Sequence, residues 1–218
     1  MSGAVALPSV TARARAYLQA LNWDGRRRLT NAATDILGAS RRGLASIYLA
    51  RTVVGAVARA FQPGCTLGSV LVLCGDGGEG KTSFLRMLAG AERFGTWSAS
   101  RGVHALQDAW IVEVPDLDEH VLADRRATFR SMLAAQTDDP HIADPLHQRC
   151  ARPSIAIGTS NAPSFWLDGA AGRFWPIQVG IRIDLGRLEE QREQLWAEAV
   201  ALYRNGERWW LDTQAGAA

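Results

Sequence analysis

The stretch SVLVLCGDGGEGKTSFLRML, residues 69–88, changes its pattern twice over a short length. It begins with a continuous apolar run of strand length and passes through a glycine-rich segment. It ends with Phe84, Leu85 and Leu88, whose spacing is that of one face of a helix. A strand, a loop and a helix therefore follow one another directly, an order that predicts an α/β protein with a parallel sheet flanked by helices.

The loop of this unit matches the phosphate-binding P-loop pattern G-x-x-x-x-G-K-[ST], with the strand before it and the helix after it that the pattern requires. Its glycines allow the backbone N–H groups to turn inward around phosphate oxygens, at the positive end of the following helix. We expect the hydroxyl of Thr82 to bind Mg²⁺. The predicted nucleotide-binding residues are Gly75, Asp76, Gly77, Gly78, Glu79, Gly80, Lys81, Thr82 and Ser83.

Lys81 is the only lysine in a chain whose other 23 basic residues are arginines. A compact ammonium on a flexible stem reaches the β- and γ-phosphates from this position, whereas a broad planar guanidinium does not fit the loop. We therefore predict that Lys81 is catalytic. A glycine-rich turn with an incidental lysine is the structural alternative.

Further apolar runs at 109–114, 154–158 and 174–179 predict more buried strands of a parallel sheet. The first of them ends in acids, and ATP hydrolysis requires a carboxylate for Mg²⁺ and a group that positions water. Glu113, as the metal ligand, and Asp116 are the leading candidates, and Asp118 and Glu119 are the alternates. A strand end that is acidic only for solubility remains open.

The run at 154–158 leads into GTSNAP, so that Thr159 and Asn161 leave the sheet at its carboxyl edge. Ligands bind at this edge in open α/β folds. We expect Asn161 to contact the γ-phosphate or the attacking water.

Helical periodicity surrounds this core. Apolar residues three and four apart occur at 14–21, at 44–61 and along 188–210. We predict a helical subdomain at 1–66, a P-loop ATPase core at 67–180 and a C-terminal helical segment at 181–218.

Charge is unevenly distributed along the chain, whose net charge is +2. Residues 1–60 hold nine arginines against two aspartates. This asymmetry favours a segment that faces nucleic acid, with Arg26, Arg27 and Arg28 as candidate DNA contacts and Trp23 beside them. The alternative is a solvated helix face in an arginine-rich protein.

Several segments together resemble the virulence-associated protein E family. They are LNWDGRRRL (21–29), the segment around the P-loop (63–90), DAWIVEVPDLDE (108–119), RPSIAIGTSNAPSFWLDGAAGRFWPIQV (152–179) and QLWAEAVALYRNGERWWL (194–211). The resemblance covers about residues 17–211. It implies an AAA+ type ATPase similar to superfamily 3 helicases, which uses ATP and Mg²⁺ for work on DNA when a phage, plasmid or genomic island replicates. We expect the DNA partner to be single-stranded.

The sequence departs from the family pattern at two places. The family has paired arginines before FWP, whereas GAAGRFWP keeps Arg173 alone. Residues 137–149 lack the arginine-bearing segment that the family commonly carries there. By resemblance, Arg173 is a candidate for a catalytic arginine that acts across a subunit interface, which predicts a homo-oligomer, a hexameric ring. Because the chain carries no primase domain, a separate primase is a possible partner.

Two other functions remain open beside the helicase-like motor. One is a nucleotide-switched DNA-binding or assembly protein that does not unwind DNA, and the other is a small-molecule kinase. We expect a cytoplasmic protein without a membrane segment. The cysteines Cys65, Cys74 and Cys150 are expected to be reduced core residues, and core packing is expected for Trp110, Trp175 and Trp196. A metal site from Asp138, Asp139, His141, Asp144, His147 and Cys150 is not favoured, because their spacing matches no common zinc pattern.

Overall fold

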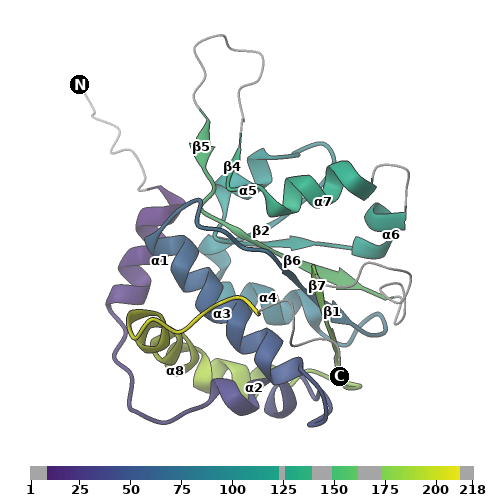
Figure 1. Cartoon of the computed structure of the whole chain (residues 1–218). Helices are drawn as coiled ribbons and strands as arrows, with labels where there is room; N and C mark the ends of the chain where they lie inside the picture. Colours follow the sequence, from purple (N-terminus) through teal and green to yellow (C-terminus); the bar gives the residue numbers. More distant parts are fainter. Residues whose placement is uncertain (1–8, 123–125, 139–148, 162–172, 212–218) are drawn as a thin grey trace, which may run out of the picture.

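A computed structural model describes residues 9–122, 126–138, 149–161 and 173–211 of the chain (Figure 1). Within these residues five parallel strands form one sheet. In spatial order they are β2 (Phe94–Thr96), β3 (Ile111–Val114), β6 (Ile155–Ser160), β1 (Val70–Cys74) and β7 (Phe174–Gln178). A short antiparallel pair, β4 (Thr137–Asp138) and β5 (Cys150–Ala151), lies apart from this sheet.

Helices cover both faces of the sheet (Figure 1). Successive side chains of a strand point to opposite faces, so Leu71 and Leu73 join one core cluster while Val72 and Cys74 join the other. The helices of the first cluster are α1 (Val10–Gln19), α2 (Leu29–Asp35), α3 (Ala45–Phe61), α4 (Lys81–Ala89) and α8 (Leu185–Arg204). Those against the other face are α5 (His104–Asp108), α6 (Leu117–Leu122) and α7 (Arg126–Ala134). This architecture confirms the α/β prediction of a parallel sheet between helices.

Tryptophans join the helices of the first face to one another. Trp110 and Trp196 are fully buried with ring centroids 4.5 Å apart, and Trp175 stacks on Tyr48. The indole N–H of Trp110 donates to the carbonyl of Ala56, 2.9 Å away, so that even its polar atom is satisfied inside the core. The expected core positions of the three tryptophans are confirmed. The helices at both ends of the chain share this core with the sheet, and the predicted division into three segments stays a prediction.

Several elements differ from the sequence prediction. The sequence does not predict strands β2, β4 and β5, helices α5 and α6 or the 3-10 turn Ala91–Arg93, whereas α2 lies within the predicted helical subdomain. The C-terminal helix begins earlier than predicted, where Asp184 caps the N–H of Arg187, and ends at Arg204 because Gly206 adopts a left-handed φ of 77°. The prediction that all three cysteines are core residues is wrong for Cys150, which is exposed; Cys74 is buried and Cys65 is half-buried.

None of the helices that the structure describes combines the length and the apolar character needed to cross a membrane.

Candidate nucleotide-binding site

The parallel arrangement gathers the predicted site residues at one edge of the sheet. Because every strand of the sheet runs the same way, all carboxyl ends lie together. Glu113 of β3 pairs in register with Ile157 of β6, and Thr159 pairs with Leu73 of β1. The P-loop follows β1 at this same edge, so residues up to 86 positions apart converge there: Gly75 to Ser83, Glu113, Thr159 and Asn161.

The P-loop backbone requires glycine at specific positions. Gly78 and Gly80 adopt φ values of 89° and 97°, which side chains rarely tolerate. At Gly75 an added Cβ would lie 1.9 Å from Oε2 of Glu79 and 2.7 Å from Cγ2 of Val179. The loop therefore takes a tight path, and α4 begins directly after Gly80. Its first backbone N–H groups are free of helical partners and suit an anion.

Lys81 is buried, and its ammonium has three acceptors. Nζ donates to the carbonyls of Gly75 and Asp76, each 2.7 Å away, and to Oδ1 of Asn161 at 3.1 Å. These three hydrogen bonds match the three donors of an ammonium. The lysine thus connects the P-loop to the end of β6, and Asn161, predicted from a different strand, lies directly beside it.

Glu113 is buried, with only 2% of its surface exposed, and two hydroxyl groups donate to its Oε1. Thr82 donates from 2.7 Å and Thr159 from 3.0 Å. Among the described residues no basic side chain forms an ion pair with this carboxyl group. A carboxylate and a hydroxyl are the oxygen donors that Mg²⁺ prefers. The two predicted metal ligands, Thr82 and Glu113, are therefore in contact and fit a divalent cation.

The other acids lie just beyond β3. Asp116 is exposed and has a positive φ of 45°. Asp118 accepts a hydrogen bond from the hydroxyl of Ser160 at 2.5 Å, while Glu119 is exposed. Asp118 and Glu119 lie in the first turn of α6, a helix that the sequence does not predict. Asp118, an alternate in the sequence prediction, is thus the one held against the strand that carries Asn161.

The sequence does not predict two segments beside the site, of which residues 179–183 contact the P-loop and the end of β1, and residues 37–38 contact Gly180. After β7, Val179 donates its N–H to Cys74, and Ile183 donates to the carbonyl of Glu79 at 3.1 Å. Gly180 in turn donates to Leu37, which follows α2. A Cβ on Gly180 would lie 3.0 Å from the carbonyl oxygen of Gly38, so glycine permits this close approach. The sequence signal for this contact is the pair Gly38 and Gly180, one glycine in each segment.

Arg173 lies at the opposite end of β7 from the P-loop. Its carbonyl accepts from the N–H of Val70 at 2.7 Å, at the amino end of both strands, and its side chain is exposed. Strand β7, at about 3.3 Å per residue, separates it from the carboxyl edge. Arg173 and Lys81 of one chain are therefore not brought together.

The candidate DNA contacts do not share one environment. Arg26 and Arg27 are exposed, whereas the guanidinium of Arg28 binds both carboxylate oxygens of Asp24 at 2.8 and 2.6 Å. These hydrogen bonds lower the pKa of Asp24. The indole N–H of Trp23 donates to the carbonyl of Arg26. Trp23 and Arg28 thus stabilise the turn at 23–28, on which Arg26 and Arg27 are exposed.

Within the described part of the chain no group of three or more His, Cys, Asp or Glu side chains is placed to hold a metal ion. Asp138 forms a buried ion pair with Arg152, and Cys150 is exposed. The other members of the disfavoured cluster lie outside the described residues: Asp139, His141, Asp144 and His147.

Comparisons with solved structures return the C-terminal region of NrS-1, in its A form without ligand. One structure has a TM-score of 0.52 and 10% identity, and the match covers 83% of this chain and 46% of that one. A second has a TM-score of 0.47 and 13% identity, with 92% and 47% covered. This chain thus spans less than half the length of these structures. The similarity with a TM-score of 0.52 concerns the fold alone. No curated protein matches the sequence.

The model of the virulence-associated protein E-like domain matches residues 18–218, nearly the whole chain. The resemblance stated from the sequence motifs is thereby confirmed. The chain belongs to the family of virulence-associated protein E-like domains.

Proposed function

We propose that this protein binds Mg²⁺ and ATP at the P-loop and hydrolyses ATP. The observation that carries the proposal is the meeting of three separately predicted parts at one sheet edge: Lys81 and Thr82 of the loop, Glu113 of β3 and Asn161 after β6. A glycine-rich phosphate loop alone supports nucleotide binding, whereas hydrolysis also needs an acid for the metal and a polar group near the γ-phosphate.

Each residue then has a distinct task. The N–H groups of residues 75–83 and the ammonium of Lys81 bind the β- and γ-phosphates, and Lys81 exchanges its carbonyl partners for phosphate oxygens when nucleotide enters. Thr82 and Glu113 hold Mg²⁺, which neutralises charge on the phosphates. Asn161 contacts the γ-phosphate or the attacking water, and Asp116 or Asp118 orients that water.

ATP hydrolysis drives work on DNA, and the protein acts as a helicase-like motor in the replication of a mobile element. Membership of the virulence-associated protein E-like family supports this assignment, and so do the exposed guanidinium groups of Arg26 and Arg27 on a surface turn. We further propose that the chain acts as a homo-oligomeric ring, a hexamer, with a separate primase as a possible partner.

The test is a steady-state and single-turnover ATPase assay with and without single-stranded DNA, using Lys81→Ala as the inactive control. A motor hydrolyses ATP faster when DNA is present. DNA binding with negligible turnover identifies the nucleotide-switched assembly protein instead, and turnover indifferent to DNA identifies a small-molecule kinase. Absence of nucleotide binding contradicts the proposal as a whole.

A further inference from the structure

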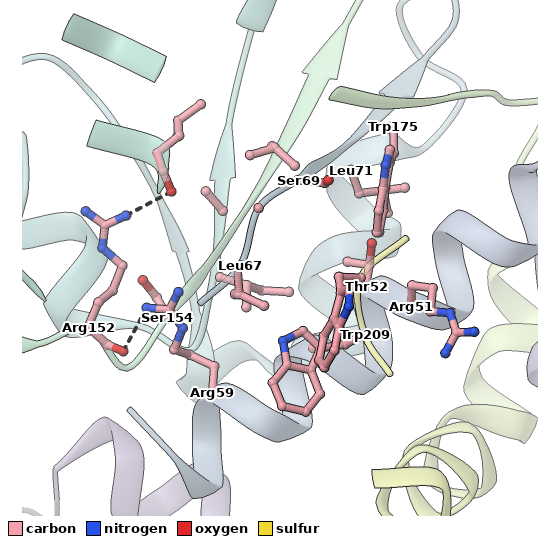
Figure 2. A pocket seen from close by; sticks show the side chains of 17 residues that line it. Arg51, Thr52, Arg59, Leu67, Ser69, Leu71, Arg152, Ser154, Trp175 and Trp209 are labelled. Atoms are coloured by element: carbon pink, nitrogen blue, oxygen red, sulfur yellow. Dashed lines mark hydrogen bonds between the residues drawn. The ribbon is translucent and has the colours of Figure 1, made fainter. Parts of the chain in front are cut away.

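Figure 2 shows the residues that line a cavity of about 30 Å³. The cavity lies at the amino-terminal edge of the sheet, at the opposite edge from the P-loop. Its walls come from the starts of three strands and from α3, and from Trp209 and Trp210 near the C-terminus. Trp210 is 43% exposed, so the cavity runs from the surface toward buried residues. The volume exceeds the roughly 10–15 Å³ that one water molecule needs and suits a compact polar group.

The described charged side chains that line this cavity are all basic. Three arginines line the cavity, namely Arg51, Arg59 and Arg152, and none of the described lining residues is acidic. Arg51 forms an ion pair with Glu207. Arg152 forms an ion pair with Asp138. The side-chain amide of Gln107 also donates a hydrogen bond to Asp138, at 2.8 Å.

Arg59 alone has no carboxylate partner among the described residues, although it is only 1% exposed. One of its Nη atoms donates to the carbonyl of Arg152 at 3.2 Å and its guanidinium is hydrogen-bonded with the Cys65 side chain, while its Nε has no hydrogen-bond partner among the described residues. Buried charges in proteins are ordinarily paired. Burial lowers the pKa of Arg59 to about 10, which still leaves the guanidinium charged at neutral pH.

Ser154 adds a second unsatisfied group to the cavity that Arg59 lines (Figure 2). Its side chain is fully buried, and its hydroxyl has no hydrogen-bond partner among the described residues. Buried polar atoms without partners are uncommon and costly. A buried cation without a carboxylate partner and with an unpaired Nε, and a hydroxyl without a partner, both line one cavity. They are complementary to an oxyanion, which accepts from both.

We infer that this cavity is a binding site for a compact oxyanion of the phosphate type, in which Arg59 supplies the charge and Ser154 a hydrogen bond. The group is either free orthophosphate or the terminal phosphate of a nucleic-acid strand. The site is separate from the P-loop, because the two lie at opposite edges of the sheet, and it does not depend on ATP hydrolysis.

Calorimetric titration with orthophosphate tests the inference on four variants of the full chain. Lys81→Ala removes the P-loop lysine, so binding that persists in it arises elsewhere. Arg59→Met removes the charge at similar volume, and the carbonyl of Arg152 keeps the N–H of Gly64 at 2.9 Å as a donor. Ser154→Ala removes only the hydroxyl. Arg204→Met, at the exposed end of α8, is the control for a general loss of positive charge.

The expected result is binding in the wild type, in Lys81→Ala and in Arg204→Met. Arg59→Met and Ser154→Ala are each combined with Lys81→Ala, so that the P-loop does not mask the result; the first should then lose binding and the second should have an affinity lowered on the order of tenfold. If Arg59→Met does not fold, the orthophosphate affinity of Ser154→Ala decides whether the inference holds. Unchanged affinity in Ser154→Ala and Arg59→Met, or binding lost only in Lys81→Ala, overturns the inference. A 5′-phosphorylated oligonucleotide that displaces orthophosphate, when its unphosphorylated counterpart does not, identifies a strand end as the source; no displacement by either identifies the free anion.

Discussion

At position 81 the chain keeps a lysine where every other basic residue is arginine, and its surroundings supply a physical reason. Three acceptors converge on one nitrogen atom, two of them carbonyls of the P-loop itself. A guanidinium spreads its donors over a plane and cannot place three of them at one point. The position therefore demands a compact ammonium before any nucleotide is bound.

Substitution of Lys81 tests this requirement. Lys81→Ala and Lys81→Arg should each abolish most ATP turnover, the first by loss of the phosphate contact and the second by misfit of the planar group. The fold should persist in both, because the core clusters do not include this side chain. The measurements are kcat by phosphate release and Tm by circular dichroism. Turnover like that of the wild type in either variant contradicts the P-loop assignment.

Substitutions of the acids near β3 should affect different steps of nucleotide binding and hydrolysis. Glu113→Gln is expected to weaken Mg²⁺-dependent nucleotide binding, since Glu113 contacts Thr82. Asp116→Asn should leave nucleotide bound and slow hydrolysis about 10²- to 10⁴-fold if Asp116 positions the water. Asparagine tolerates the positive φ at this position, so the change is confined to the charge.

Asp118→Asn is the comparison for these two variants, because Asp118 is held by Ser160 at the same edge. Nucleotide affinity is measured by fluorescence titration and hydrolysis in a single turnover. A large loss of hydrolysis in Asp118→Asn together with a small one in Asp116→Asn moves the water-positioning role to Asp118.

At the scale of elements, the long buried strands were predictable because each is a continuous apolar run. Strand β2 was not, since Phe94-Gly95-Thr96 is short and contains a glycine, and its pairing with β3 decides its conformation. The two-residue strands β4 and β5 likewise depend on each other. Helix α6 is not predictable either, because acids adjacent to a strand end also fit a surface turn.

The candidate site likewise contains residues that the sequence predicts and contacts that it does not predict. Residues 75–83 carry a local motif, and Glu113 and Asn161 follow from the rule that strand ends converge. The contacts of residues 37–38 with 180, and of 183 with the P-loop, join segments more than 100 positions apart. Nothing in the local pattern of either segment specifies its partner, so a single sequence does not reveal them.

Close packing between α6 and β6 gives a stability prediction. A Cβ on Gly158 would lie 2.5 Å from Cδ2 and 3.2 Å from Cβ of Leu117. Gly158→Ala should therefore destabilise the fold by about 1–3 kcal/mol, as overpacking does, and displace Asp118 with its helix. Urea unfolding measures the change. Gly68→Ala is the control, because an added Cβ there meets no atom within 4 Å; equal stability of the two variants contradicts the packing argument.

The turn at 23–28 carries the DNA prediction. Charge reversal of Arg26 and Arg27 should lower affinity for single-stranded DNA and flatten its salt dependence, by about 0.7 in the log–log slope for each phosphate that the protein no longer neutralises. Basal ATPase activity should not change. Arg28 is left in place, because its ion pair with Asp24 stabilises the turn. Arg204→Glu on α8 serves as control, and DNA affinity equal to that of the wild type in the reversed variant favours the solvated-face alternative.

At the scale of the whole molecule, the two edges of the sheet differ in chemistry. The carboxyl edge gathers the phosphate loop and the acids, whereas the amino edge presents Arg173 and the arginine-lined cavity. An arginine at the amino edge stands a full strand away from the phosphates of its own chain. Arg173 can take part in hydrolysis only where a second chain brings its carboxyl edge to this position.

Hydrolysis across an interface would then require assembly. A guanidinium supplied in trans raises the rate on the order of 10³- to 10⁵-fold by stabilising charge in the transition state. We expect Arg173→Ala to bind ATP normally and to lose most of its turnover, and turnover per subunit of the wild type to rise with protein concentration as rings form. Analytical ultracentrifugation with ATP and DNA reports the assembly itself.

Mixing two inactive variants decides whether Arg173 acts on a neighbour. A subunit with Arg173→Ala retains its P-loop, and a subunit with Lys81→Ala retains its arginine, so a mixed ring contains interfaces at which both groups are intact. Those interfaces should regain a fraction of the wild-type rate that depends on the mixing ratio, which neither variant reaches alone. If Arg173 instead forms only contacts within its own chain, the mixture stays as inactive as its components, and the trans-acting arginine and the ring that it implies are both wrong.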